Sequence, residues 1–354
     1  MEFGINLAPS ADSWKIVKRA EELGFDVAWF VDSQLINADL FVAMTASAMA
    51  TKKIKLGTGM LIPSNRIAPV AANALASLNK LAPGRIQFGV ATGFTARRSM
   101  GLGPVRLAEF KEYVRVVLAL LAGETVEWVF EGKRRKIRFL NPDLGQIDLE
   151  HPIALHISAL GPKIRAFAAE LGAGFVTPVG SVAAGEAAIA AIKAAWREAG
   201  RNEADLRVTA VGNGCVLAQG EPCDSPRAKA QAGPGAAIVL HDLVERPLHG
   251  SSGHALAPEI AARLEAFRRI YDAYEPSDAR YLSAHRGHLM IVRPEEEQLI
   301  DAELIRRLTM TGTVPELRER LRRLREAGYT RFSTHIRYGQ PRMVEDWAEV
   351  IAGA

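Results

Sequence analysis

The sequence contains few cysteines and no long apolar run. Cys215 and Cys223 are the only cysteines among 354 residues, so the chain has neither a disulfide framework nor a paired CxxC metal motif. We interpret them as buried or incidental thiols. No apolar run approaches the roughly 18 to 20 residues of a membrane-spanning helix, and no basic and apolar leader precedes the strand-like start MEFGINLAP. These absences predict a cytoplasmic protein that does not insert into a membrane.

Charge of one sign is not concentrated in any block of the chain. The formal net charge is +4 and the pI is about 9.1, but the Lys and Arg residues are dispersed among Asp and Glu. This dispersion indicates solvated helix faces, not a nucleic-acid or membrane surface. With 48% hydrophobic and 24% charged residues, the composition is that of an ordinary soluble globular protein with one large α/β domain or two smaller ones.

Apolar runs of β type alternate with segments of helical periodicity. The candidate strands are residues 3–7, 27–31, 54–62, 86–90, 153–158, 175–178, 207–217 and 332–336. The helices expected between and after them are residues 12–23, 38–50, 71–81, 107–121, 163–171, 183–199 and 315–327. Strands separated by helices favour parallel pairing, and a count near eight predicts closure into an α/β (β/α)8 barrel. A doubly wound open sheet is the alternative.

Two segments interrupt this regular spacing. Residues 125–149 alternate apolar and charged side chains around Glu131-Gly132, which indicates a hairpin inserted before the fifth strand. Residues 221–308 contain a Gly, Pro and Ala-rich stretch, the loop LHGSSGHA and a helix over 258–274. A stretch of this length without β/α rhythm is typical of a lid over an active site or a self-association surface. We expect a single domain over 1–354 that carries both insertions.

Two consecutive strands, the third and fourth, end in segments rich in Gly, Thr, Asn and Arg. The third strand runs into GTGMLIPSNRIAP, where Gly59 allows close backbone approach to a ligand or forms a simple strand exit. Asn65 and Arg66 follow, and they either contact a ligand or cap a helix and carry surface charge. The carboxyl ends of parallel strands are where α/β proteins bind ligands, so this region is the first candidate site.

The fourth strand ends in the segment ATGFTARR. Thr92 offers a hydroxyl donor, and Gly93 offers flexibility. Arg97 and Arg98 form a pair of guanidinium groups suited to a phosphate or an acidic substrate. The alternative is that both arginines cover the adjacent helix.

Two further segments precede helix starts, where backbone N–H groups favour an anion. In TPVGS, residues Val179, Gly180 and Ser181 lead into a helix, and ordinary N-capping by Ser181 is the competing interpretation. Thr311 and Gly312 precede the helix over 315–327 and carry the same ambiguity.

Several polar residues lie on or near strands. Asn6 and Asp32 either contact a ligand or satisfy neighbouring backbone. His156 lies inside an apolar strand, which favours a hydrogen-bonded core histidine over a catalytic one. His285 and His288 lie in the long insertion, where an imidazole can exchange protons with a ligand or simply stabilise a loop. Their HxxH spacing lacks a third nearby ligand, so no metal site is predicted.

Three motifs in this order resemble the bacterial-luciferase-like superfamily of flavin-dependent oxidoreductases. They are RAEELGFDVAWFVDS, LGTGMLIPSNRIAPVAANALASLNKLAPGRIQFGVATG and TGTVPELRERLRRLREAGYTRFSTHI. The resemblance implies a (β/α)8 barrel that binds FMN, or the related 5-deazaflavin coenzyme, at the carboxyl ends of its strands. Family members often have a strained peptide near the strand end at Gly59, against one face of the ring.

The resemblance implies a flavin-dependent enzyme, first a monooxygenase that uses reduced FMN and oxygen on a small organic substrate. Such enzymes can receive reduced flavin from a separate reductase. The alternative is a deazaflavin-dependent reductase or dehydrogenase that transfers hydride without oxygen, and SALGPKIRAFAAELGAGFV resembles that branch in particular. The 221–308 insertion is the candidate shield of the site, and a homodimer or higher homo-oligomer is expected.

These expectations assign the site residues. The cofactor contacts are Asn6, Gly59, Met60, Leu61, Thr92, Gly93, Arg97, Arg98, Ser158, Val179, Gly180, Ser181, Thr311 and Gly312. The substrate contacts are Asp32, Asn65 and Arg66, and the catalytic residues are His285 and His288. A non-redox phosphate-binding barrel is a competing class, but it needs a central strand-end Lys or carboxylate that the sequence does not offer. A non-catalytic flavin-binding protein is the second competing class.

Overall fold

Eight parallel strands close into a barrel. The computed structural model describes residues 1–249 and 258–354. The barrel strands are β1 (Glu2–Leu7), β2 (Val27–Phe30), β3 (Lys55–Thr58), β4 (Ile86–Val90), β7 (Ala154–Ser158), β8 (Gly174–Pro178), β9 (Val208–Gly212) and β12 (Arg331–Ile336). They are hydrogen-bonded in the order β1-β12-β9-β8-β7-β4-β3-β2, and β1 pairs with β2 to complete the ring. The predicted (β/α)8 barrel is confirmed, and the open-sheet alternative is excluded.

Helices surround the barrel, and local sequence sets their ends. They are α1 (Ser13–Glu22), α2 (Leu40–Ala50), α3 (Ala68–Leu81), α4 (Thr95–Arg98), α5 (Leu107–Leu121), α6 (Pro162–Leu171), α7 (Val182–Glu198), α12 (Val314–Ala327) and α13 (Met343–Ile351). In α12, Thr313 and Glu316 form a capping box, and Gly328 at φ 118° ends the helix in the left-handed region. The predicted helices agree with the observed ones to within about three residues at each end.

The seventh strand is shorter than predicted. Residues 207–217 were expected to form one strand, but β9 ends at Gly212 and the chain turns before β10 (Val216–Leu217). β10 pairs with β11 (Gly312–Thr313) in a separate two-stranded parallel sheet. The main chain at Met310 passes so close to Gly214 that a Cβ there would lie 2.0 Å from the Met310 carbonyl oxygen. The segment at Met310 therefore packs directly against the chain that follows β9.

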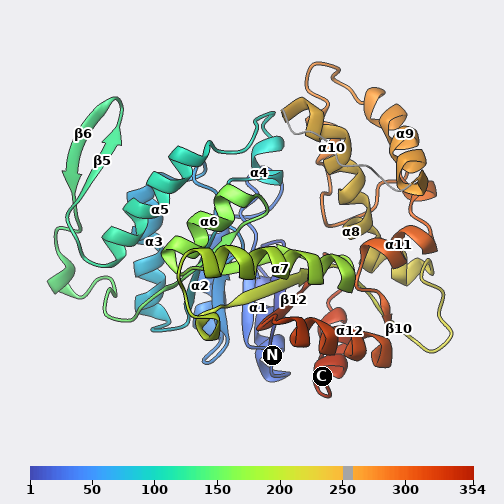
Figure 1. The fold of residues 1–354 in the computed structure, drawn as a ribbon, viewed down its shortest axis with the longest axis horizontal. Helices are drawn as coiled ribbons and strands as arrows, with labels where there is room; N and C mark the ends of the chain where they lie inside the picture. The colour runs from blue at the N-terminus through green and yellow to red at the C-terminus, as the bar shows by residue number, and fades with distance from the viewer. Residues whose placement is uncertain (250–257) are drawn as a thin grey trace.

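The first insertion is the predicted hairpin. Strands β5 (Val126–Phe130) and β6 (Lys133–Ile137) pair antiparallel, and they project away from the barrel (Figure 1). Glu131 and Gly132 connect them at φ 50° and 71°, the two left-handed residues that a tight hairpin turn requires. A short 3-10 helix, η1 (Pro142–Leu144), follows before β7.

The second insertion forms a helical layer beside the barrel mouth. Its helices are α8 (Pro226–Glu245), α9 (Pro258–Asp272), α10 (Tyr281–Ala284) and α11 (Ala302–Leu308), with 3-10 turns η3 (Arg246–His249) and η4 (Glu297–Leu299). A further turn, η2 (Glu203–Asp205), precedes β9. The insertion has its own apolar core around Leu240, Phe267 and Ile300. Residues 250–257, which hold most of the predicted LHGSSGHA loop, lie outside the described residues. None of the helices in the described ranges combines the length and apolar character that a bilayer crossing requires.

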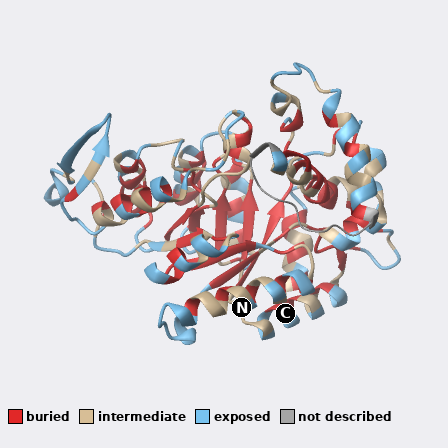
Figure 2. Ribbon diagram, turned by 45° about the horizontal axis from the view of Figure 1, so that its top comes forward, coloured by how far each residue is buried: buried red, intermediate tan, exposed pale blue. Residues whose placement is uncertain are grey.

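Most residues of the barrel strands are buried (Figure 2). Within the barrel, His156 on β7 pairs its Nε2 atom with Gln87 Oε1 at 2.9 Å and meets the Trp29 ring edge-on at 5.2 Å. Gly174 makes room for the imidazole, because a Cβ there would lie 2.4 Å from His156 Nδ1. The interpretation of His156 as a hydrogen-bonded core residue is confirmed.

His156 makes stability depend on pH. Burial, with the Arg331 charge nearby, lowers the pKa of His156 to about 3. Its folded-state pKa lies below the unfolded value, so its contribution is complete above about pH 6.5 and is lost as pH falls toward 3. Between pH 6 and 5, we expect wild type to lose up to about 1.4 kcal/mol more unfolding free energy than His156→Gln. Urea denaturation at both pH values measures this difference, and parallel pH dependences of the two proteins would contradict it.

Candidate functional site

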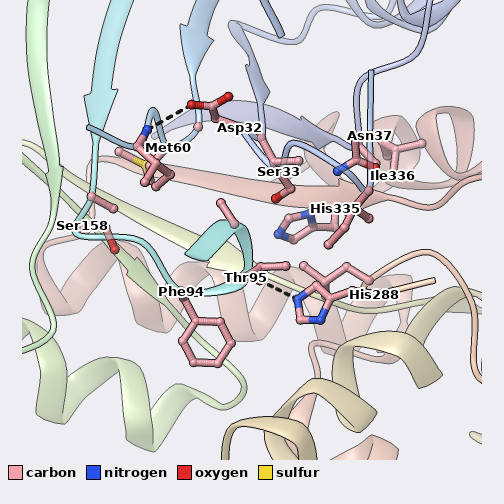
Figure 3. A pocket seen from close by; sticks show the side chains of 18 of the residues that line it. Asp32, Ser33, Asn37, Met60, Phe94, Thr95, Ser158, His288, His335 and Ile336 are labelled. Atoms are coloured by element: carbon pink, nitrogen blue, oxygen red, sulfur yellow. Dashed lines mark hydrogen bonds between the residues drawn. The ribbon is translucent and has the colours of Figure 1, made fainter. Parts of the chain in front are cut away.

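A cavity of about 190 Å³ opens at the carboxyl ends of the barrel strands. Six strand ends contribute to its wall: those of β1, β2, β3, β4, β7 and β12, through Ala8, Asp32, Met60, Ala91, Ser158 and Arg337 respectively. The long insertion adds His288 and Leu289. Figure 3 shows Met60 and Ser158 on one side, with His335 and His288 on the other. Pockets that enclose whole ligands usually measure roughly 300 to 1,000 Å³, so this cavity suits the reacting end of a ligand whose remainder lies outside.

The end of β3 carries a cis peptide bond between Gly59 and Met60. Both residues line the cavity, as predicted from the strand-end motif. Gly59 lies against Trp29, and a Cβ at Gly59 would lie 2.7 Å from the Trp29 Cβ. Leu61 is fully buried behind the wall, where its N–H donates to the Gly89 carbonyl. Gly59 and Met60, not Leu61, therefore form this part of the surface.

The three predicted substrate contacts lie close together: Asp32, Asn65 and Arg66. Asp32 accepts from Arg66 Nη1 at 2.9 Å and from the Ile62 N–H at 3.1 Å. Asn65 donates to the Asp32 carbonyl and to Gln34 Oε1. Arg66 also pairs with Asp39. Only Asp32 of the three predicted residues lines the cavity, and its charge is already paired. The group braces the loops after β2 and β3.

The two arginines after β4 lie outside the cavity wall, and both make contacts within the chain. Arg98 Nη1 lies 3.1 Å from Asp242 Oδ1 and 3.4 Å from Glu245 Oε2, and the guanidinium stacks on the Phe94 ring. Arg97 Nε donates to the Gly103 carbonyl. Both carboxylates come from α8, far away in the sequence, so the strand-end motif could not reveal that Arg98 is held by internal ion pairs.

Several predicted cofactor contacts lie outside the cavity wall, for specific reasons. Asn6 accepts from Ser333 Oγ inside the barrel. Gly180 packs on α11, since a Cβ there would lie 2.7 Å from the Leu308 carbonyl oxygen, and Ser181 caps α7 through the Ala184 N–H. Thr311 accepts from the Cys215 N–H. The other predicted contacts outside the wall are Thr92, Gly93, Val179 and Gly312. Ser158 does line the cavity.

The two predicted catalytic histidines occupy different places. His288 lines the cavity, and its Nε2 atom lies 2.7 Å from Thr95 Oγ1 (Figure 3). Burial, with nearby His285, His241 and arginine charges, lowers the pKa of His288 well below its usual value. His285 lies behind it, 3.2 Å from Glu245 Oε2, and faces a separate hollow. Of the two histidines, only His288 lines the cavity at the strand ends.

His335 and Arg337 line the cavity at the end of β12, and neither is among the site residues predicted from the sequence. Their strand is predicted, but no residue of it is assigned to the site. The signal was present, since STHIR places polar side chains at a strand end as the β3 and β4 motifs do. Thr95 and Asn37 also line the cavity without having been selected.

The fold and the cavity define a class of protein: a parallel (β/α)8 barrel with its ligand site among the loops at the carboxyl ends of the strands. The chain belongs to the luciferase-like monooxygenase family, whose model matches residues 8–331. The resemblance derived from the sequence motifs is confirmed.

Two relatives of the chain are named as a reductase and a dehydrogenase. The chain is 33% identical over 215 residues to the 5,10-methylenetetrahydromethanopterin reductase of Methanolobus tindarius, covering 59% of this chain and 64% of that protein. It is 34% identical over 143 residues to the F420-dependent glucose-6-phosphate dehydrogenase of Beutenbergia cavernae, covering 38% of this chain and 40% of that protein. The chain thus matches less than two thirds of each relative's length.

A solved structure shows the same fold over the whole length. The coenzyme F420 dependent tetrahydromethanopterin reductase from Methanopyrus kandleri superposes with a TM-score of 0.70 and 21% identity, covering 99% of this chain and 98% of that one. At this identity, the likeness concerns the barrel and its insertions.

The ion pairs of Arg98 predict a loss of stability when this residue is changed. Arg98→Met leaves Glu245 buried without its guanidinium, so we expect the unfolding free energy to fall by about 3 kcal/mol or more. The matched variant Arg97→Met removes a hydrogen bond to a backbone carbonyl and should cost only about 1 kcal/mol. Chemical denaturation of both variants measures the difference. Equal losses, or a larger loss for Arg97→Met, would contradict the assignment.

Proposed function

We propose that this protein is a deazaflavin-dependent oxidoreductase that transfers hydride between coenzyme F420 and a small organic substrate, without oxygen. The observation that carries the proposal is the kind of relative it matches at 30% identity or more. These are named as a methylenetetrahydromethanopterin reductase and an F420-dependent dehydrogenase. An FMN monooxygenase is the first expectation from the sequence, and these relatives favour the deazaflavin alternative.

The residues of the cavity fit a flat conjugated ring with polar edges. Apolar side chains supply surfaces for the ring faces, namely Val31, Ile36, Met60, Ile62, Phe94, Leu289 and Ile336. Ser33, Asn37 and Ser158 supply hydroxyl and amide groups for its edges. His288 has a buried Nδ1 atom without a partner among the described residues, a group that a polar ligand can satisfy. When bound, the deazaflavin supplies the hydride chemistry.

The chain's own residues then orient the ligand and manage the proton. Oxidation of an alcohol to a carbonyl by hydride loss also releases a proton, and the reverse reaction takes one up. We assign this proton to His288, whose neutral imidazole lines the cavity and whose ring is held by Thr95 at Nε2. His285 stands behind it as a positioning residue. The insertion that carries both histidines limits the access of water.

The FMN monooxygenase remains the second candidate because the matching family model is described as luciferase-like monooxygenase. The two candidates differ in cofactor and in oxygen consumption. Fluorescence titration of the purified protein with each cofactor, followed by oxygen-electrode measurements with the reduced forms, separates them. We expect selective deazaflavin binding and no substrate-dependent oxygen uptake. Selective FMN binding with such uptake would refute the proposal.

A larger side chain in the cavity wall tests whether the deazaflavin binds in this cavity. Ala91 lines the cavity at the end of β4, so Ala91→Phe should fill ring space and weaken deazaflavin binding by at least about tenfold, or 1.4 kcal/mol. The matched control Ala166→Phe adds the same bulk at an exposed position on α6 and should bind as wild type does. Fluorescence titration, with circular dichroism to verify folding, gives both results. Equal affinities in the two variants would place the cofactor elsewhere.

A further inference from the structure

Arg337 is the most buried of the four buried arginines of residues 1–249 and 258–354, and it has no carboxylate partner there. Its exposed fraction is 2%, against 5% for Arg293, 7% for Arg331 and 8% for Arg98. Each of the other three forms an ion pair: Arg98 with α8, Arg293 with Glu296 and Arg331 with Glu2. Burying a charge without a counter-ion is costly, so this exception requires an explanation.

Neutral oxygens hold the Arg337 guanidinium in place. Nε donates to the Gln231 carbonyl at 2.8 Å, Nη1 to the Leu289 carbonyl at 2.8 Å, and Nη2 to Asn213 Oδ1. Leu289 adopts φ 58°, a strained left-handed conformation for leucine, so this contact is built at a conformational cost. A guanidinium has five N–H bonds, and these contacts use three. Two remain, the number that a bidentate oxyanion accepts.

The neighbouring helix is shaped to allow this arrangement. Gly235 on α8 lies so close to Asn213 that a Cβ there would fall 2.3 Å from the Asn213 Cβ, and 3.0 Å from Arg337 Nη2. Because glycine occupies this position, the helix packs directly over the loop after β9 and brings the Gln231 carbonyl to the guanidinium. The burial of Arg337 therefore depends on the packing of α8, the loop after β9 and the end of β12 against one another.

Burial without an acidic partner lowers the pKa of Arg337 to about 9. The guanidinium therefore remains charged at neutral pH, inside a wall of the cavity. Asp32 is the only carboxylate among the residues lining this cavity, and its charge is paired with Arg66. Arg337 is therefore the one residue lining the cavity whose charge has no counter-ion among the described residues.

Two imidazoles line the same cavity beside Arg337. His335 is 9% exposed and His288 is 5% exposed. Within the described part of the chain, no hydrogen bond engages the His335 ring, and His288 Nδ1 is buried without a partner. Burial and the Arg337 charge lower the pKa of His335 to about 3. Both rings therefore present unpaired nitrogen atoms next to an unpaired cation.

We propose that Arg337, His335 and His288 form a binding subsite for an oxyanion, a carboxylate or phosphate group carried by the substrate. The inference rests on the proposed function, because it takes this cavity as the place where the substrate meets the cofactor. It adds the chemical class of that substrate: a small anionic molecule. The two imidazoles of the subsite, His335 and His288, lie across the cavity from Met60 and Ser158 (Figure 3), which leaves that side for the ring.

Anion binding at this position should be coupled to proton uptake. A negative charge beside His335 and His288 favours their protonated forms, so it raises their pKa values. The groups that face them are Arg337, Thr95, His285, His241 and Arg98. Glu245 pairs with His285, and Glu296 pairs with His241. These two carboxylates therefore lie behind the groups that face His335 and His288. Protons taken up on binding would equip the site to protonate a substrate oxygen.

The test uses the ligand-free protein, with inorganic phosphate and acetate as probes. Histidine ring resonances in NMR and calorimetry in two buffers of different ionisation enthalpy report binding and proton uptake. We expect saturable binding that shifts the His335 and His288 resonances towards the protonated form. Arg337→Met should weaken it by about tenfold or more, and Arg337→Lys should restore part of it. Absence of saturable binding to wild type, or unchanged affinity in folded Arg337→Met, would overturn the subsite.

A matched control and a second arm identify the source of the anion. Arg331→Gln removes a buried guanidinium from the opposite end of β12 and should leave anion binding unchanged. If it abolishes binding as Arg337→Met does, the effect is general and the assignment is wrong. Repeating the titration with deazaflavin present separates two sources: continued phosphate or acetate binding supports a substrate oxyanion, while competition assigns the subsite to the cofactor and overturns the proposal. Failure of the protein to bind deazaflavin refutes the proposed function but leaves the ligand-free titration interpretable.

Discussion

Parallel closure of the eight strands is the constraint on which the site depends. Because every strand runs in the same direction, residues as distant in sequence as Ala8 and Arg337 reach the same rim. The barrel interior is packed with side chains such as Trp29 and His156, so a ligand can enter only above the strand ends. The loops there carry the chemistry, and the barrel supplies the rigid frame that holds them together.

The long insertion completes the site by burying charge at this rim. Helix α8 brings Asp242 and Glu245 to Arg98, which fastens the insertion to the loop after β4. The same helix contributes the Gln231 carbonyl to Arg337 but no carboxylate. One arginine is thus neutralised and serves structure, whereas the other keeps its charge in the wall of the cavity. The difference between them depends on which side chains α8 presents at each contact.

The sequence predicts the fold better than it predicts the site. Alternating β and helical periodicity located all eight barrel strands, and Glu131-Gly132 located the hairpin turn, because these signals are local. The rule that strand ends bind ligands points to Gly59 and Met60, and both residues line the cavity, as does the assigned cofactor contact Ser158. That rule cannot tell which strand-end side chain turns inward. Arg98 was selected and is held by α8, while Arg337 follows the same rule at β12 and was passed over. The partners of both arginines lie in the insertion, whose packing has no periodic signal in the sequence.

The central claim is that the cavity among these strand ends receives the ring of a deazaflavin, with room for substrate beside Arg337. A crystal structure of the protein soaked with oxidised coenzyme F420 tests it most directly. We expect electron density for the ring against Gly59 and Met60, with His288 and Arg337 facing the side left open for substrate. Density for the ring outside this cavity, or against Arg337 itself, would contradict the account.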